Sequence, residues 1–401
     1  MAAFRQPGCY ATPVAARVKL HPMIDPVLEA RVRLAMVSGL GPTLTRRLEE
    51  TIGSPLEICD ATTTQLQRVK GISRKKADLI RRGLDEADIE RELHMIQSQG
   101  VQLISFDDDH YPALLRHIVD PPSLLFVRGQ LQRTDGLALA VVGSRKCTQY
   151  GREQADRMAS LCAQAGLTIV SGGAIGIDTA AHEATLRVGG RTIVVLGCGL
   201  GQCYPPQNKE LFGRVARGGG AVVSELPMTA PPIAENFPAR NRIISGLSLG
   251  VLVVEASNRS GASITARLAA EEHHREVMAM PGRVDSPASM GCHRMIREGW
   301  ATLVTSPADV LDCLGDAGQT LKVALDESPT EGAEADASPA PTNLQGDAAR
   351  IFNAMTREAV GIDALCSATG LAVASVQAHL MQLQLSGLVE RVPGNQVRRR
   401  Q

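Results

Sequence analysis

The sequence predicts an α/β protein built around an extended, Rossmann-like sheet that is doubly wound and mainly parallel. Between residues 106 and 316, apolar runs rich in β-branched residues alternate with stretches of helical periodicity. Such runs are typical of parallel strands buried on both faces, and right-handed crossovers then place helices on both sides of the sheet. The expected strands are residues 137–143, 167–173, 191–197, 221–226, 251–257, 276–282 and 301–306.

Before this sheet, we expect a flexible tail over residues 1–26 and an all-helical domain over residues 27–105. In two places an apolar residue, a glycine and a second apolar residue precede a helix: VSGLGPTLTRRLEE (37–50) and VKGISRKKADLIRRG (69–83). This spacing is typical of SAM-like or helix-hairpin-helix domains, whose turns direct backbone N–H groups at a phosphate. The second copy is basic. It is either a contact for a nucleic-acid backbone or the solvated face of a small helical bundle.

After the sheet, residues 317–345 are expected to form a disordered acidic linker, because ALDESPTEGAEADASPAPTN combines five acids and three prolines with almost no bulky side chain. Residues 346–401 have the pattern of a winged-helix domain, with three helices and a hairpin that turns at Pro393-Gly394-Asn395. The third helix contains no Lys or Arg, which favours contact with a protein over insertion into a DNA major groove.

The composition is ordinary for a globular chain of 401 residues, with 44% hydrophobic and 21% charged residues. The formal net charge is zero, which excludes a uniformly basic surface but not a local basic groove. No apolar run approaches the roughly 18 residues of a membrane span, and no signal peptide is visible. The nine cysteines match neither a disulfide framework nor a zinc motif, so we expect a reducing cytoplasm and neither a metal nor a cofactor.

Small and basic residues follow the expected strands, at the sheet edge where α/β proteins bind ligands. The first loop is formed by Gly143, Ser144 and Arg145. The glycine lets a ligand approach the backbone closely, the serine offers a hydroxyl, and the arginine offers a forked donor for phosphate. The sequence contains neither the GxGxxG spacing of nicotinamide dehydrogenases at this strand nor the GxxxxGK[ST] of P-loop ATPases.

In SGGAIGIDTAAHEA (171–184) three glycines, Gly172, Gly173 and Gly176, precede a helix and let its N–H groups face a ligand. Asp178 and His182 share one helical face, but the spacing offers no third metal ligand. We therefore favour a scaffold role for Asp178, stabilised by the helix dipole, over catalysis.

Three further loops carry basic or small residues. Lys209 and Phe212 lie three residues apart at a helix start, so they share one face of the helix. Together they offer a charge for phosphate and a ring for a base. Taken alone, Lys209 would be a solvated surface charge and Phe212 a core residue. The run Arg240-Asn241-Arg242 precedes an apolar helix, and Gly261 opens another. Several such loops with little acid–base chemistry between them suit an extended polyanion that is bound phosphate by phosphate.

Together these motifs resemble the DNA-processing protein A family, known as DprA or Smf, over roughly residues 30–315. The motifs are GSR (143–145), SGGAIGIDTAAHEATL (171–186), VLGCGL with YPPQN (195–208), SELP (224–227), FPARNRIISGLS (237–248) and SGASITA (260–266). The winged helix resembles an accessory domain of many members. The resemblance implies a non-catalytic, cytoplasmic, homodimeric protein that binds single-stranded DNA, protects incoming strands and loads the RecA recombinase during natural transformation and recombination.

The resemblance also assigns roles to residues. Gly143, Ser144 and Arg145 match the family's phosphate-binding loop, Lys209 matches its basic DNA contact, and Phe212 falls at a base-stacking position. The pocket edge of the family is matched by Gly172, Gly173, Arg240, Asn241, Arg242 and Gly261.

This sequence departs from the family where members commonly carry Asn and Ala, at His293 (after Cys292) and Trp300, which puts DNA contacts from this loop in doubt. We expect His293 to be hydrogen-bonded rather than a metal ligand. The alternative function is a nucleotide-processing enzyme of the phosphoribohydrolase type, whose signature is PGGxGTxxE. Leu268 stands where that chemistry needs the glutamate.

Overall fold

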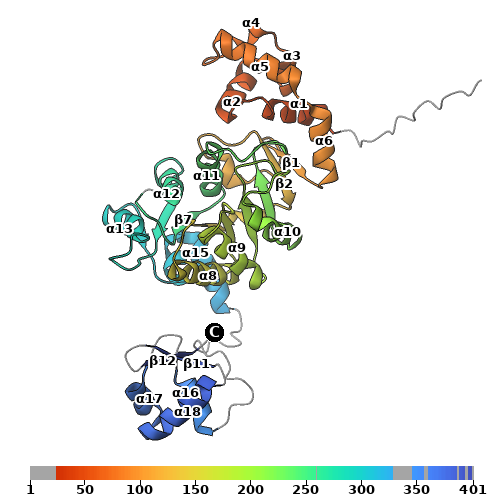
Figure 1. Cartoon of the computed structure of the whole chain (residues 1–401). Helices are drawn as coiled ribbons and strands as arrows, with labels where there is room; N and C mark the ends of the chain where they lie inside the picture. Colours follow the sequence, from red (N-terminus) through yellow and green to blue (C-terminus); the bar gives the residue numbers. More distant parts are fainter. Residues whose placement is uncertain are drawn as a thin grey trace, which may run out of the picture. The chain divides into compact units, whose positions relative to one another are not determined.

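A computed structural model of the chain describes residues 24–258, 260–327, 346–355, 360–385, 388–392 and 396–399. The chain forms two compact units, Met1–Leu325 and Asp326–Gln401. The first unit contains the N-terminal helices and the large sheet, and the second contains the C-terminal domain (Figure 1).

One nine-stranded sheet forms the centre of the first unit, in the order β1-β2-β6-β5-β4-β3-β7-β8-β9. The pairings from β6 through to β9 are parallel, whereas β2 pairs antiparallel with both β1 and β6. The predicted doubly wound, mainly parallel sheet is confirmed, and two unpredicted antiparallel strands extend one edge. The strands are β1 (Gln102–Ser105), β2 (Leu124–Gly129), β3 (Ala138–Val142), β4 (Thr168–Ser171), β5 (Thr192–Val195), β6 (Ala221–Ser224), β7 (Gly250–Val253), β8 (Glu276–Ala279) and β9 (Thr302–Leu303).

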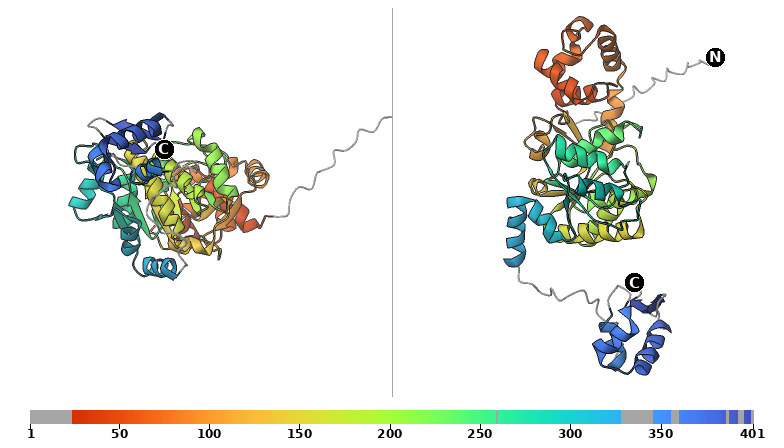
Figure 2. Two further views of the ribbon diagram at one scale, coloured as in Figure 1. Left: turned by 90° about the horizontal axis from the view of Figure 1, so that it is seen from below. Right: turned by 90° about the vertical axis from the view of Figure 1, so that its left-hand side faces the viewer.

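Helices cover both faces of this sheet (Figure 2). Strand β3 shows why: Ala138 and Ala140 face one apolar layer, while Leu139 and Val141 face the other. One face carries α7 (Ala113–Arg116), α11 (Asn236–Gly246), α12 (Gly261–Glu271) and α13 (Met290–Arg297). The opposite face carries α8 (Gln149–Gln164), α9 (Ile177–Arg187), α10 (Lys209–Arg217) and α14 (Pro307–Cys313). Two short 3₁₀ turns, η1 (Arg133–Gly136) and η2 (Pro206–Asn208), complete the connections.

The N-terminal helices form a small domain with an apolar core of its own. The helices that share this core are α1 (Pro26–Ala35), α2 (Pro42–Thr51), α3 (Pro55–Asp60), α4 (Thr63–Leu66) and α5 (Arg74–Glu86). A sixth helix, α6 (Ile89–Ser98), instead packs Ile89, Leu93 and Ile96 into the core beneath the sheet. The sheet layer therefore begins before the predicted boundary at residues 105 and 106, because the apolar face of α6 and strand β1 belong to it.

The predicted linker is corrected at its start. Residues 317–327 were expected to be disordered, but helix α15 (Gly315–Glu327) continues through them. Leu321 packs against the core of the sheet, and Lys322 forms an ion pair with Asp312. These contacts hold the segment in place, although its acidic composition predicts disorder. The remainder, residues 328–345, and most of the predicted tail, residues 1–23, lie outside the described residues.

The second unit confirms the predicted winged helix. Its elements are α16 (Gly346–Asn353), β10 (Val360–Gly361), α17 (Ile362–Thr369), α18 (Val373–Leu385), β11 (Val389–Val392) and β12 (Gln396–Arg399). Strand β12 pairs antiparallel with both β10 and β11, and Val392 pairs with Gln396. The predicted hairpin turn at residues 393–395 lies between these partners and outside the described residues.

The central position of β3 predicts a graded cost of side-chain truncation. Leu139→Ala removes a fully buried side chain between two parallel neighbours and should lower the free energy of unfolding by about 2–5 kcal/mol. Leu303→Ala in edge strand β9 is the matched control: its side chain is 48% exposed, and the change should stay within about 0.5 kcal/mol. Urea unfolding of both variants checks this, and equal costs would contradict the assignment of β3 to the centre of the sheet.

Candidate functional site

The topology of the sheet creates a crevice at one edge. Strands β3 and β7 are parallel neighbours, but the helices that follow them, α8 and α12, pack on opposite faces. The two loops therefore diverge, and ligands of α/β sheets bind where they do. A cleft of about 770 Å³ lies there. It is lined by loop residues that follow β3, β4, β7 and β8 and by the first half of α11.

The loop after β3 contributes the predicted Gly143, Ser144 and Arg145. A Cβ on Gly143 would lie 2.5 Å from Ile177 Cγ1, so the glycine is required for packing against α9. The Ser144 backbone N–H donates to the carbonyl of Glu255 (2.8 Å), which ties the loop to the end of β7. Arg145 and Lys146 then lie exposed at the cleft, and neither forms an ion pair with any described carboxylate.

The glycines after β4 allow a close approach of charged groups. A Cβ on Gly172 would lie 2.7 Å from Arg240 Nη2 and 2.9 Å from Asp178 Oδ2. Gly173 has a positive φ of 65°, and its Cα faces the ring of Phe212. Gly172 thus lies at the floor of the small pocket and Gly173 lies against the apolar core, and in both places only a hydrogen atom fits.

Asp178 and His182, on α9, are both buried and form hydrogen bonds within the protein. Asp178 is buried and accepts a hydrogen bond from the Ala174 backbone N–H (3.2 Å); burial raises its pKa, although the nearby Arg240 opposes this. His182 is fully buried, its Nδ1 lies 2.7 Å from Thr192 Oγ1, and burial lowers its pKa to about 3. A neutral, enclosed imidazole is not placed to exchange protons with a ligand in the cleft.

Arg240 occupies the floor between the loops. Its guanidinium donates to the carbonyls of Gly172 (2.7 Å) and Val195, and burial lowers its pKa to about 10, against the attraction of Asp178. Its Nε donates to Asn241 Oδ1 (3.3 Å). Arg240 and Asn241 both line the cleft as predicted, but they lie within α11 and not before a helix as expected.

A smaller pocket of about 60 Å³ opens beside the cleft and shares Arg145, Ala174, Phe237 and Arg240 with it. The Tyr204 and Phe237 rings lie beside each other, with centroids 5.3 Å apart and planes tilted by 48°, and the Arg145 guanidinium lies 5.4 Å from the centre of the Phe237 ring. Tyr204 is 40% exposed. Sequence reasoning missed both rings, although each stands in a quoted motif, YPPQN or FPARNRIISGLS, in a chain with only 3% aromatic residues.

The expected role of Phe212 is corrected. Its side chain is only 5% exposed and packs in the apolar core against Val194, so it offers no ring to a ligand. Lys209, three residues earlier on α10, is exposed and lines neither cavity. The two residues do not act as a pair, because the apolar face of α10, which includes Leu211 and Val215, turns Phe212 toward the sheet.

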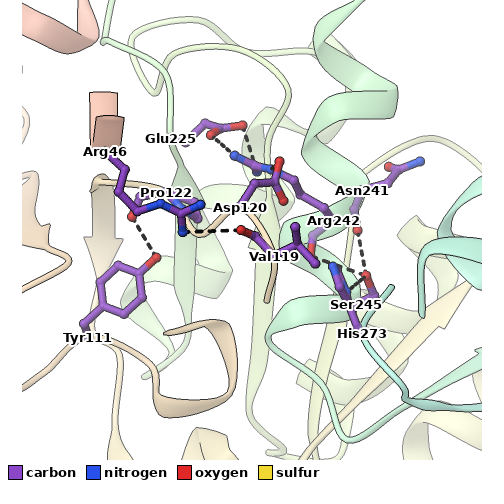
Figure 3. A network of polar contacts seen from close by, with 10 residues as sticks. All are labelled: Arg46, Tyr111, Val119, Asp120, Pro122, Glu225, Asn241, Arg242, Ser245 and His273. Carbon is purple, nitrogen blue, oxygen red and sulfur yellow. Dashed lines mark hydrogen bonds and ion pairs between the residues drawn. The ribbon is translucent and has the colours of Figure 1, made fainter. Parts of the chain in front are cut away.

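Arg242 is also corrected, from a ligand clamp to a structural ion pair. Its Nε donates to Asp120 (2.8 Å), and its terminal nitrogens donate to both oxygens of Glu225 (3.1 and 2.5 Å; Figure 3). Burial alone would lower the pKa of Arg242, but the two carboxylates outweigh it and raise the pKa. The side chain is buried, so its charge is committed to these two partners.

Gly261 lines the cleft as predicted, at the first turn of α12. Ser260 caps the helix by accepting from the Ser263 backbone N–H (3.3 Å), and the space beside the Gly261 Cα is open. In the segment that departs from the family pattern, His293 Nε2 lies 3.3 Å from the backbone nitrogen and 3.1 Å from the carbonyl oxygen of Gly282, and Cys292 is buried. Trp300 donates to Glu298 (3.0 Å).

The described part of the chain holds no group of three or more His, Cys, Asp or Glu side chains arranged for a metal ion. Its helices include none with the length and apolar character of a membrane span.

Comparison with known proteins adds three family models and several relatives. The model of DNA recombination-mediator protein A matches residues 102–315, the DprA winged helix domain matches residues 335–395, and the SAM-like helix-hairpin-helix tandem matches residues 32–86. Protein Smf of Synechocystis is 36% identical and covers 91% of this chain and 97% of its own. Protein Smf of Escherichia coli is 40% identical and covers 78% of this chain and 81% of its own. The X-ray structure of DNA processing protein A from Streptococcus pneumoniae superposes with a TM-score of 0.60 at 35% identity, over 72% of this chain and 98% of that one.

The network around Arg242 predicts a loss of stability. Arg242→Ala leaves the carboxylates of Asp120 and Glu225 without their cation and should lower the free energy of unfolding by about 3 kcal/mol. Arg283→Ala is the control, because its ion pair with Asp285 is exposed and should contribute nothing measurable. Thermal unfolding of the two variants distinguishes them, and an unchanged Arg242→Ala melting temperature would show that the network is not structural.

Proposed function

The chain belongs to the DNA recombination-mediator protein A family, also called DprA or Smf, and we propose that it binds single-stranded DNA in the cleft and the adjoining small pocket. The binding is non-catalytic in this proposal. The bound strand is held by its phosphates and by its bases at the same time.

The observation that carries the proposal is the meeting of unpaired cations and accessible rings at one place. Arg145 and Lys146 are exposed at the cleft without an ion-pair partner among the described residues, and Tyr204 and Phe237 lie beside them. Single strands are bound by this combination, since cations follow the backbone while aromatic rings stack on unpaired bases. A duplex would not offer its bases to the rings.

The length of the site favours a polymer over a single nucleotide. The cleft runs along loops from several strands, and the Ser144 hydroxyl, Asn241 and the first turn of α12 at Gly261 all line it. Each supplies a hydrogen-bonding group or the positive end of a helix, which are suitable contacts for successive phosphates.

A catalytic role is the weaker candidate, because the acidic groups around the cleft are engaged. Asp178 accepts from Ala174, and Glu255 is buried and accepts from the Thr148 backbone (2.8 Å) and hydroxyl (2.6 Å). Leu268 stands at the position of the phosphoribohydrolase glutamate. Release of free base from nucleoside monophosphates by the purified protein would favour the enzyme instead.

Family membership also supports three proposals on the setting of this binding. The chain acts in the cytoplasm as a homodimer, it protects incoming DNA during natural transformation, and it loads RecA recombinase onto the bound strand. Sedimentation analysis tests the dimer, and the rate of RecA assembly on single-stranded DNA with and without the protein tests the loading.

The exposed cations predict the first binding result. Arg145→Ala and Lys146→Ala should each weaken oligo-dT binding by about 1–3 kcal/mol, because each removes a charged phosphate contact at the cleft, and the double variant should bind more weakly than either. Arg133→Ala removes an exposed charge in η1, which precedes the amino end of β3, and the variant should bind as the parent does. Unchanged gel shifts of the double variant at moderate salt would contradict the site.

The two rings predict the second result. Tyr204→Ala and Phe237→Ala should each cost about 1–3 kcal/mol of oligo-dT affinity through lost stacking, whereas Tyr204→Phe should retain it. Phe212→Leu keeps an apolar side chain at the buried position and should not affect affinity at full folding. Loss of affinity in Phe212→Leu without loss in Tyr204→Ala would contradict stacking at Tyr204 and assign base stacking to Phe212 instead.

A further inference from the structure

The floor of the small pocket holds a cation whose hydrogen-bonding capacity is only partly used within the protein. Arg240 is 5% exposed. Its Nη1 donates to the carbonyls of Gly172 and Val195, and its Nε donates to Asn241 Oδ1. Its Nη2 donates to no acceptor among the described residues, and no described carboxylate forms an ion pair with the guanidinium. A buried charge in this state is costly, and an anionic ligand would remove that cost.

Asp178 does not supply this anion. It attracts Arg240, but its carboxylate accepts a hydrogen bond from the Ala174 backbone N–H (3.2 Å) and lies beyond ion-pair distance of the guanidinium. Both charged groups lie against Gly172, where an added Cβ would be 2.7 Å from Arg240 Nη2. Because Gly172 and Arg240 both line the pocket, the unengaged Nη2 lies at the pocket floor.

The pocket contains a second cation and no acidic residue. Arg145 also lines it, is exposed at the rim and forms no ion pair with a described carboxylate, and no lining residue is Asp or Glu. Burial lowers the pKa of Arg240 to about 10, Asp178 opposes this, and the like charge of Arg145 adds to it. Two neighbouring guanidinium groups that repel each other favour a ligand with more than one negative charge.

The volume of the pocket limits which part of a nucleotide can enter it. The pocket holds about 60 Å³, whereas a benzene ring occupies a cavity of about 150 Å³. A nucleobase is therefore too large, and a single phosphate group is the part that fits. A base next to that phosphate would lie outside the pocket, against the exposed Tyr204 ring.

Charge and shape together favour a phosphate at the end of a strand over one within it. A phosphate monoester carries about 1.5 to 2 negative charges at neutral pH and has three strong acceptor oxygens. A phosphate within a strand carries a single charge, and the chain must leave the pocket on both of its sides. We propose that the small pocket binds the terminal phosphate monoester of a single strand, so that the chain recognises a phosphorylated strand end.

This inference rests on the proposed function and places one end of the bound strand. The pocket shares Arg145, Ala174, Phe237 and Arg240 with the cleft. A strand whose end phosphate lies in the pocket can therefore continue directly into the cleft. There its following phosphates meet Lys146 and the first turn of α12 at Gly261.

The test uses the full chain and an oligo-dT about six nucleotides long, within the range of a single-strand site. Four forms are compared: hydroxyls at both ends, a 5′-phosphate, a 3′-phosphate, and the tighter-binding phosphorylated form with its end phosphate methylated. One phosphorylated end should raise affinity about tenfold, the size of one charged hydrogen bond. Methylation should remove most of this gain, because it leaves a diester of single charge. Equal affinity of all four forms, or an equal gain from both phosphates and the methylated one, would overturn the proposal.

A pair of variants assigns the preference to the pocket. Arg240→Gln should bring the ratio of phosphorylated to hydroxyl-ended affinity close to one, because the amide carries no charge. Lys146→Ala is the control, since Lys146 lines the cleft and not the pocket. It should weaken both forms and keep their ratio within about twofold of the parent. Partial unfolding lowers both affinities equally and leaves the ratio unchanged. An equal fall of the ratio in both variants would show a general charge effect and overturn the proposal.

The failure of this proposal is distinguishable from failure of the proposed function. Tight binding of the hydroxyl-ended oligo-dT with no gain from an end phosphate leaves the single-strand function standing and removes recognition of the end. Absence of binding by all four forms contradicts both.

Discussion

The parallel pairing of β3 with β7 is the constraint on which the rest of the molecule depends. These strands lie side by side, yet the chain leaves them toward opposite faces, because one crossover helix packs on each side of the sheet. Their carboxyl ends cannot be covered by either helix, so a crevice is unavoidable. Only glycine fits at positions 143 and 172 beneath the crevice, because an added Cβ would clash with Ile177 or Arg240.

Burial separates the charges that build this crevice from those that are available to a ligand. Arg240, Arg242 and Glu255 are all nearly inaccessible, and each is held by carbonyl, carboxylate or hydroxyl partners within the protein. An unpartnered charge at such depth would be costly, which is why every one of them has a partner. Arg145 and Lys146 lie at the rim, where water already solvates them, so they can exchange water for phosphate at little cost.

Much of the fold could be predicted from local patterns, because each buried parallel strand appears in the sequence as a continuous run of apolar residues. Strands β1 and β2 were not predicted because they are antiparallel and lie outside the repeating strand–helix pattern. The structure has a cleft at the strand ends, where the candidate site was expected, but the contacts of individual side chains could be read only from the fold. A spacing of three residues placed Lys209 and Phe212 on one helical face, yet only the packing of α10 shows that Phe212 points inward. The partners of Arg242, Asp120 and Glu225, are distant in sequence, and no local pattern connects them.

The uneven distribution of aromatic residues has a practical consequence for spectroscopy. The only tryptophan, Trp300, lies just after α13 at the sheet, and no aromatic residue occurs between residues 24 and 105. Tryptophan fluorescence therefore reports on the sheet region, and neither it nor near-ultraviolet dichroism detects the helical domain of residues 24–86. Loss of helix in that domain is visible only in the peptide absorption region, so the difference between the two signals measures how independently the two parts of the first unit unfold.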